Sequence, residues 1–224
     1  MKIPFTQISL QSQKAFLIVL SVLFLPIYVP PSSAVDGTLA DRKKTDTPAD
    51  HELFIRQTYS LAMSAAKKGN HPYGAILVHQ GKVILTAENT VNTGKDSINH
   101  AEVNLLRKAR RELSPEVLRQ STLYTNVAPC MFCCSAMWYS GIKRVVYGVS
   151  YKTIAKLTDF EEKSIPCDKL YKDTGRPLEW IGPILEEEGL QVFCCWPNDS
   201  FRPLLLKKLE GREGIGRSCN AESQ

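Results

Sequence analysis

Two short segments of the chain carry residue types that bind metals and move protons. His100 and Glu102 flank a single alanine, and Cys130 and Cys133 follow Pro129 with two residues between them. If each segment opens a helix, the two cysteines share one helix face and their sulfurs point at one centre. The positive end of the helix dipole then favours thiolates over thiols.

This donor set predicts a zinc site with one zinc per chain. One imidazole nitrogen from His100 and the sulfurs of Cys130 and Cys133 suit zinc, and three protein ligands leave a fourth position open for water. Glu102 is not expected to be a ligand. Its carboxylate would take a proton from the activated water and return it to the substrate, so Glu102 is the predicted catalytic residue. The chemistry would be hydrolysis of a carbon–nitrogen bond with release of ammonia.

A closed structural zinc site with a fourth cysteine is the alternative. Cys134 and Cys167 are the candidates for the fourth ligand. Cys134 adjoins Cys133, and its side chain would point about 100° away from that neighbour on a helix, which disfavours it. A structural site would also have no use for a carboxylate such as Glu102 beside the metal.

The remaining pattern predicts the elements that must position these residues. Helices are expected at about 50–68, 98–111, 129–141 and 186–195. Strands are expected at 75–78, 83–85, 122–126, 142–149 and, more weakly, 178–185. Asp50 is the predicted N-cap of the first helix, and Gly141 ends the third. The alternation predicts an α/β layered domain with a central sheet.

The N-terminus has the layout of a secretory signal peptide. Lys2 and Lys14 precede an apolar run at 15–29, prolines at 30–31 end that run, and Ser32-Ser33-Ala34 offers the small residues that a signal peptidase reads. The run is short for a membrane span. We therefore expect a secreted or periplasmic protein, with an uncleaved anchor, or a misassigned start and a cytoplasmic chain, as alternatives.

Charge and cysteine content restrict the partners and the covalent framework. The formal net charge is only +5, and the basic clusters at 107–111 and 207–208 are interpreted as solvated helix faces, so a nucleic-acid partner is not favoured. Seven cysteines, an odd number with adjacent pairs, indicate no regular disulfide framework. An oxidising compartment could still join some of the five outside the metal motif. These five are Cys134, Cys167, Cys194, Cys195 and Cys219.

The stretch from His71 to Val149 resembles the cytidine deaminase-like superfamily, specifically its nucleoside deaminase branch, which includes bacterial tRNA adenosine deaminases and guanine deaminases. An H-x-E segment followed by P-C-x-x-C is the signature of zinc deaminases. The matching residues are His71 to Ala75, Asn89, His100 to Glu102, Thr122 to Thr125, Pro129 to Cys133, and Ile142 to Gly148. The resemblance implies a three-layer α/β/α sandwich with a central five-stranded mixed sheet, frequently as a homodimer.

The resemblance also implies substrate contacts and a domain plan. Asn89 would hydrogen-bond the base or the sugar of the substrate, although it could instead be a simple turn residue. The Ala75 backbone and Glu102 would contact the edge of the base. Relatives usually have Glu before the Pro-Cys pair, where this chain has Val127-Ala128. The expected plan is a signal peptide at 1–34, a linker at 35–50, the CMP/dCMP-type deaminase domain at 51–210 and a flexible tail at 211–224.

Three functions are compatible with these residues. The first is deamination of a free nucleobase or nucleoside, and the second is conversion of a tRNA wobble adenosine to inosine. The third, from another class, is a non-catalytic zinc-bound structural module, which Glu102 disfavours. The signal peptide and the weak basicity favour a small-molecule substrate, because RNA binding requires basic side chains that contact the phosphates.

Overall fold

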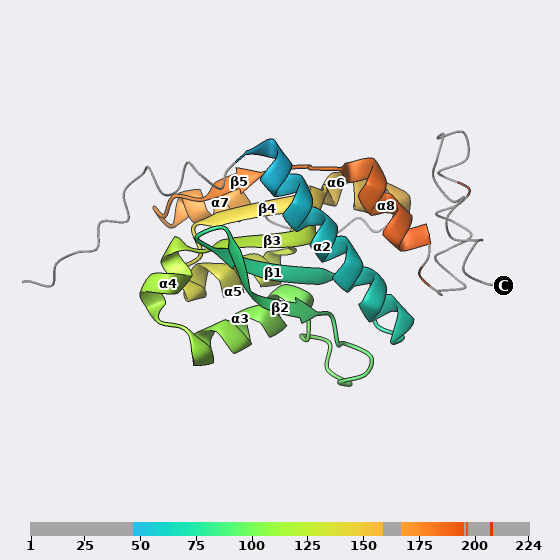
Figure 1. Ribbon diagram of the computed structural model, residues 1–224, viewed down its shortest axis with the longest axis horizontal. Helices are drawn as coiled ribbons and strands as arrows, with labels where there is room; N and C mark the ends of the chain where they lie inside the picture. The colour runs from blue at the N-terminus through green and yellow to red at the C-terminus, as the bar shows by residue number, and fades with distance from the viewer. Residues whose placement is uncertain (1–46, 159–166, 195, 197–206, 208–224) are drawn as a thin grey trace, which may run out of the picture. The chain divides into compact units, whose positions relative to one another are not determined.

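A computed structural model describes residues 47–158, 167–194, 196 and 207 (Figure 1). The predicted signal peptide at 1–34 and tail at 211–224 lie outside the described residues, as does most of the predicted linker. Within the described part of the chain, no helix combines the length and the apolar character needed to cross a membrane.

The elements follow one another in an alternating α/β order. The helices are α2 (Pro48–Lys67), α3 (Ala101–Glu112), α4 (Pro115–Gln120), α5 (Met131–Ser140), α6 (Tyr151–Thr158), α7 (Cys167–Asp173) and α8 (Glu186–Cys194). The strands are β1 (Gly74–His79), β2 (Lys82–Glu88), β3 (Thr122–Val127), β4 (Arg144–Val149) and β5 (Glu179–Ile181).

The strands form one five-stranded mixed sheet in the order β2-β1-β3-β4-β5. β1 is antiparallel to both β2 and β3, whereas β3, β4 and β5 are mutually parallel. The parallel pairs need crossover connections, and α5 supplies the one between β3 and β4. The mixed five-stranded sheet implied by the resemblance is therefore confirmed.

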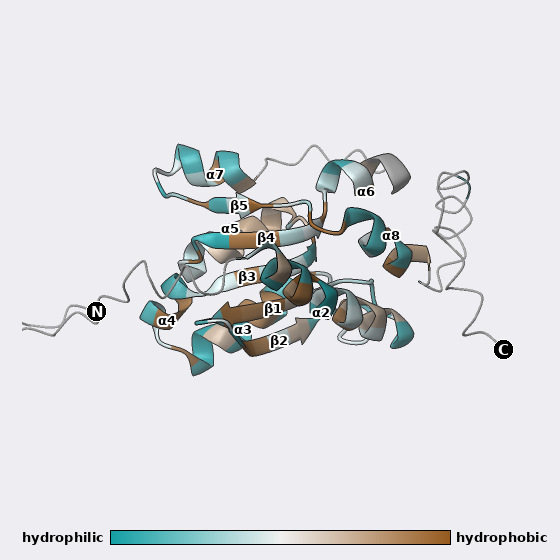
Figure 2. Cartoon of the chain, turned by 45° about the horizontal axis from the view of Figure 1, so that its top comes forward, coloured by the Kyte–Doolittle hydropathy of each residue, from teal (hydrophilic) through white to brown (hydrophobic). Residues whose placement is uncertain are grey.

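Helices cover both faces of the sheet and make it the middle of three layers (Figure 1). One core cluster joins α2 and α8 to the sheet, and a second joins α3, α5 and α7 to the other face. Every residue of β3 is buried, as expected for a strand covered on both sides. In Figure 2 the strands of the sheet carry much of the hydrophobic colouring, most evenly on β1, while the ribbon of α7 is largely hydrophilic.

The predicted N-cap of the first helix is wrong. Thr47, not Asp50, caps α2: the Asp50 backbone N–H donates to Thr47 Oγ1 at 3.2 Å, and Asp50 Oδ2 accepts from the Thr47 backbone N–H at 3.2 Å. This reciprocal pair is a capping box, in which the acidic residue takes the third helical position. The helix therefore begins at Pro48, inside the predicted linker.

Other differences concern short or truncated elements. The structure contains α4, α6 and α7, which the sequence pattern does not predict because six to eight residues are too few to show a clear helical period. The weak strand predicted at 178–185 is limited to Glu179–Ile181. Pro183 follows closely, and a residue without a backbone N–H cannot extend the hydrogen-bonded ladder.

Candidate active site

Two helix N-termini carry the predicted metal ligands. His100 is the N-cap of α3 and Cys130 is the N-cap of α5. The two helices therefore begin three and two residues later than the sequence pattern predicts. Neither side chain makes a capping hydrogen bond. Cys133 is the third helical residue of α5, and side chains at the N-cap and third positions face each other, as in a capping box. The two thiols therefore converge.

The three donors have the spacing of a tetrahedral metal site. His100 Nδ1 lies 3.6 Å from Cys130 Sγ and 3.5 Å from Cys133 Sγ, and all three donor atoms lie within 4.8 Å of one another. Zinc–nitrogen bonds of about 2.0–2.1 Å and zinc–sulfur bonds of about 2.3 Å at tetrahedral angles separate nitrogen from sulfur by about 3.5 Å. Both the spacing and the chemistry of the donors fit zinc.

The two thiols share a proton unevenly. The hydrogen bond from Cys133, assisted by His100, lowers the pKa of Cys130 to about 4. The same hydrogen bond and burial raise the pKa of Cys133 well above its usual range. One thiolate is therefore stable at neutral pH, and the second proton leaves only if a cation compensates the added negative charge, which is how a divalent metal binds a thiol pair.

Glu102 lies beside the three donors and outside their cluster. Its side chain is buried, Thr125 Oγ1 donates to its Oε1 at 3.2 Å, and Cys133 Sγ lies 3.5 Å from its Oε2. Burial, followed by the negative charge of Cys130, raises the pKa of Glu102. A carboxyl group with a raised pKa can both accept and donate a proton near neutral pH, which is the requirement for a general acid–base.

The two predicted substrate contacts lie in the buried interior. Asn89 is 1% exposed, its Oδ1 accepts from the Val91 backbone N–H at 3.0 Å, and its buried Nδ2 has no hydrogen-bond partner among the described residues. A buried hydrogen-bond donor without a partner costs about 1–3 kcal/mol of stability, so an acceptor atom on a bound ligand would supply the missing hydrogen bond. Ala75 lies opposite Thr125 in the sheet, next to the partner of Glu102.

Two residues of β3 complete the arrangement and are absent from the sequence-based site. Thr125 binds the Glu102 carboxylate, and Asn126 accepts from the Gly74 backbone N–H at 2.9 Å and donates to the Pro72 carbonyl at 3.0 Å. The signal for both was a pair of neighbouring polar residues in a buried strand, three residues before Pro129.

Comparisons with known proteins agree with this geometry. Residues 48–149 match the family model described as "Cytidine and deoxycytidylate deaminase zinc-binding region". A probable cytosine deaminase of Schizosaccharomyces pombe is 35% identical over 148 residues, which cover 61% of this chain and 86% of the relative. The chain belongs to the cytidine deaminase-like superfamily. A guanine deaminase of Bacillus subtilis is another relative, 32% identical over 66% of this chain and 95% of its own length.

The superfamily fold is also found among solved structures. A structure from studies of A-to-I editing by tRNA:A34 deaminases superposes with a TM-score of 0.51 at 23% identity, and covers 62% of this chain and 98% of that one. This likeness concerns the fold. Since the named relatives differ in their substrates, membership of the superfamily places the chain in a deaminase family without establishing its substrate.

In this chain the two candidates for a fourth metal ligand are bonded to each other. Cys134 and Cys167 form a disulfide with their Cα atoms 5.4 Å apart. Neither sulfur can then bind a metal as a thiolate. The closed-site alternative, which needed one of them as its fourth ligand, therefore loses both candidates.

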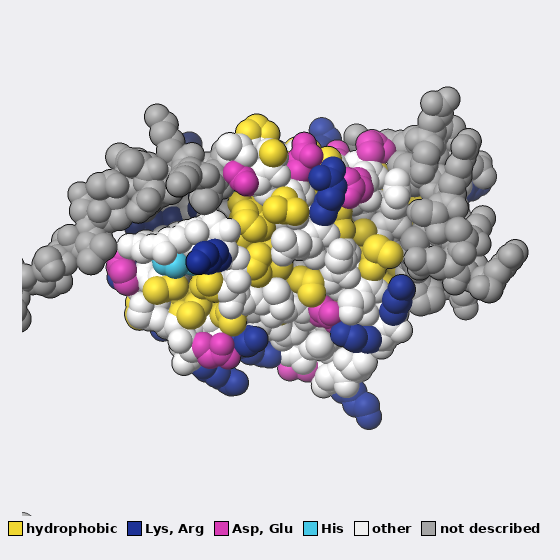
Figure 3. All heavy atoms as spheres, viewed as in Figure 1, with side chains coloured by type: hydrophobic (Ala, Val, Ile, Leu, Met, Phe, Trp, Pro, Cys, Tyr) yellow, Lys and Arg dark blue, Asp and Glu magenta, His cyan; other side chains and the backbone are white. Residues whose placement is uncertain are grey.

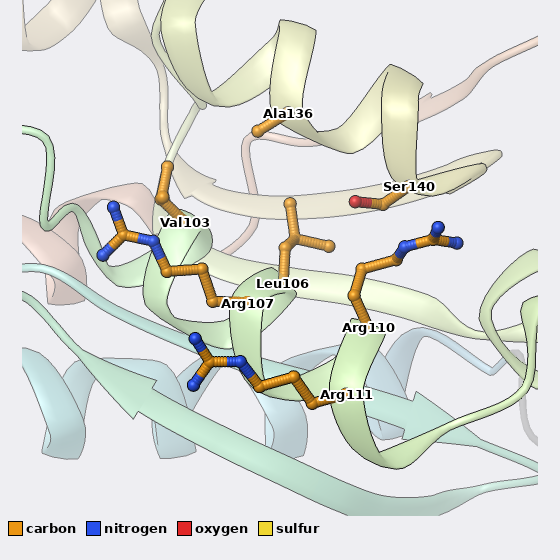
Figure 4. A pocket seen from close by; sticks show the side chains of 7 residues that line it. All are labelled: Val103, Leu106, Arg107, Arg110, Arg111, Ala136 and Ser140. Carbon is orange, nitrogen blue, oxygen red and sulfur yellow. The ribbon is translucent and has the colours of Figure 1, made fainter.

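The basic cluster at 107–111 borders a groove of about 330 Å³ between α3 and α5 (Figure 4). Arg107, Arg110 and Arg111 extend from α3, and Ala136 and Ser140 line the α5 side. Arg107 also donates to Asn99 Oδ1 at 2.6 Å. The cluster is thus a solvent-facing helix surface, as predicted, with a concave strip along it.

Removal of a thiol ligand should remove the metal. We expect about one zinc per chain in the purified protein and well below that in Cys130→Ser and Cys133→Ser, because a hydroxyl binds zinc poorly where a thiolate is required. Cys194→Ser is the matched control, since Cys194 is buried in the core on the opposite face of the sheet. Metal analysis by mass spectrometry measures the content, and full zinc in both ligand variants would contradict the site.

Proposed function

We propose that the chain is a zinc-dependent hydrolytic deaminase of a free nucleobase or nucleoside, which replaces an amino group by oxygen and releases ammonia. The observation that carries the proposal is the buried carboxylate of Glu102, held 3.5 Å from the Cys133 sulfur without belonging to the three-donor cluster. A structural metal site does not need a proton carrier at its open side.

The proposed mechanism follows from the two oxygens of Glu102. His100, Cys130 and Cys133 would hold the zinc, which supplies a Lewis acid that lowers the pKa of a water molecule. Thr125 Oγ1 donates to Glu102 Oε1, so Oε2, on the side of Cys133, would be the oxygen that takes a proton from the water. Glu102 would pass this proton to the ring nitrogen as the water oxygen bonds to the carbon that carries the amine. It would then take the second proton, from the new hydroxyl group, and pass it to the amine as the carbon–nitrogen bond breaks, so that water and amine yield a carbonyl and ammonia.

Asn89 would orient the base. Its buried Nδ2 is a donor without a partner among the described residues, which suits a carbonyl oxygen or a ring nitrogen on the edge of a planar heterocycle. The Ala75 backbone, beside Thr125, would contact the same edge. A pocket that recognises a base in this way discriminates strongly, because a wrong ligand leaves the amide unpaired.

A tRNA wobble adenosine deaminase is the second candidate. The observation in its favour is the concave strip bordered by Arg107, Arg110 and Arg111, which could bind backbone phosphates. Elsewhere the described surface is mixed: on the face that carries α2, acidic and basic side chains are interspersed with apolar ones (Figure 3). Arg56 there pairs with Glu52 and Glu188. The small-molecule substrate therefore remains our proposal.

A substrate screen decides between these candidates. We expect ammonia release from at least one free base or nucleoside and little inosine formation in tRNA. Ammonia is measured against a panel of bases and nucleosides, and inosine by digestion and mass spectrometry of tRNA. Inosine at an anticodon adenosine, with no small-molecule turnover, would reverse the ranking, and Arg110→Glu would then weaken tRNA binding.

Glu102 and His100 should give two different phenotypes when substituted. Glu102→Gln keeps the shape and removes the proton carrier, so zinc should be retained while kcat falls by about 10²–10⁴-fold. His100→Ala should lose zinc and stability together, because metal binding contributes to folding free energy. Activity, zinc content and thermal unfolding are measured on both. Near wild-type turnover by Glu102→Gln would refute the mechanism, and loss of its zinc would favour a non-catalytic structural module.

The Thr125 hydroxyl should matter through the Glu102 carboxylate. Thr125→Val keeps the volume and removes the donor to Oε1, and loss of a hydrogen bond to a charged group, worth about 1.5–3 kcal/mol, predicts a roughly 10–100-fold lower kcat with zinc retained. Thr122→Val is the matched control, because Thr122 lies three residues earlier in the same strand, about 10 Å away along it. Equal activity of the two variants would exclude the proposed role.

We propose that the mature protein is exported after cleavage following Ala34. The sequence layout of 1–34 and the Cys134–Cys167 disulfide support this proposal, because disulfides persist in oxidising compartments. N-terminal sequencing of protein from separated cell fractions should begin at Val35 in the exported fraction. A cytoplasmic product that retains Met1 would contradict export and would make a tRNA substrate as well supported as a small-molecule substrate.

The homodimer implied by the resemblance stays a prediction.

A further inference from the structure

The Cys134–Cys167 disulfide joins the helix of the thiol ligands to a second helix. Cys134 lies in the first turns of α5 and Cys167 is the first residue of α7. The sulfurs are linked, the Cα atoms are 5.4 Å apart, and the two residues are 1% and 2% exposed. Both belong to the core cluster that packs α3 and α5 against the sheet. The link is therefore internal to the layer that carries the metal site.

Polar contacts strengthen the same attachment. We call residues 167–176 the α7 strap. Trp138 Nε1 donates to Thr174 Oγ1 at 2.8 Å, and Arg176 both stacks over the Trp138 ring at 3.7 Å and donates to the Trp138 carbonyl at 2.9 Å. Tyr171 donates to the Ile142 carbonyl at 3.0 Å, just after α5 ends. The strap thus holds the N-terminal part of α5 covalently and its C-terminal part by hydrogen bonds.

The covalent attachment lies one residue from a metal ligand. Cys133, the ligand, and Cys134, the disulfide partner, are consecutive on the first turns of α5. The first turn of a helix frays most readily, because its backbone N–H groups have no partner inside the helix. A link at Cys134 restrains the backbone where the Cys130 and Cys133 sulfurs must keep their positions.

The disulfide also removes a competing thiol. Three thiols within five residues, Cys130, Cys133 and Cys134, offer alternative ligand pairs and alternative disulfides. Formation of the Cys134–Cys167 bond transfers two electrons and two protons to a disulfide oxidant, such as glutathione disulfide, which becomes two thiols. Cys134 can then neither replace a ligand nor be oxidised with one.

We propose that the Cys134–Cys167 disulfide is a positioning element of the metal site, which slows loss of the metal by restraining the first turn of α5 and withdrawing the third thiol. The proposal rests on the metal site of the proposed function. It assigns no contact with the substrate to either cysteine.

The test compares two redox states of one sequence and one variant. Full-length protein with all thiols reduced is loaded with zinc, which protects Cys130 and Cys133, and half of it is then oxidised by glutathione disulfide. Mass spectrometry of alkylated peptides verifies the state of Cys134 and Cys167. Transfer of zinc to a coloured chelator should be about 10-fold or more slower in the oxidised protein, in the range seen for groups that support metal ligands.

A variant separates positioning from general stability. In Cys134→Ala/Cys167→Ala, oxidation should no longer slow zinc transfer, and the rise in melting temperature on adding zinc should be smaller than in Cys194→Ala, the control on the opposite face. A merely structural disulfide would lower the melting temperatures with and without zinc by the same amount. That result, or equal transfer rates for the two redox states, would overturn the proposal.

The outcomes also distinguish this inference from the proposed function. If the protein binds no zinc in either redox state, the proposed function fails and the inference fails with it. If zinc binding and ammonia release persist but both redox states transfer zinc equally, only the inference fails. The redox comparison requires no substitution, so it remains decisive if the double variant does not fold.

Discussion

The structure depends on one constraint: two helix N-termini must meet beside the end of β3. His100 caps α3 and Cys130 caps α5, so the positive ends of both helix dipoles are directed at the place where the sulfurs gather. The hydrogen bond between the two thiols lowers the pKa of Cys130 and raises that of Cys133, so two adjacent thiolates need positive charge beside them. The dipoles and a bound cation together would make the pair stable, and the sheet fixes the two helices in place.

Much of the site could be predicted because the residues that carry its chemistry lie close together in the sequence. His100, Glu102, Cys130 and Cys133 occupy two segments of at most four residues, and the elements around them have strong periodic patterns. The five-stranded sheet followed from the resemblance. The starts of the helices were predicted less well. Thr47 rather than Asp50 caps α2, and the spacing of the apolar residues does not show which hydroxyl or carboxylate is the cap.

Contacts between distant segments were the part that the sequence could not provide. The link between Cys134 and Cys167 spans 33 residues and depends on α7, a seven-residue helix with too short a pattern to predict. Thr125 reaches Glu102 across 23 residues, and Asn126 reaches the segment before β1 across more than 50. Such pairs require the tertiary arrangement, because many buried threonines and asparagines have no catalytic neighbour.

Relatives of this chain are named for different substrates, so family membership does not by itself determine substrate preference. The metal donors and Glu102 belong to α3 and the start of α5, whose positions are fixed by the core. Asn89 lies after β2, in the loop that ends at His100, the N-cap of α3. In the proposed function, substrate preference would depend on this loop, so the contact to the base and one metal ligand belong to the same segment.

The anchoring of Glu102 by Thr125 has a consequence for the order of events in a catalytic cycle. In the proposed function, Oε1 accepts from Thr125 and Oε2 is left for the protons of the reaction, so one oxygen would receive and release each of them. The proton transfers would then follow one another, and the ring nitrogen and the amine of the substrate would have to reach the same oxygen in turn.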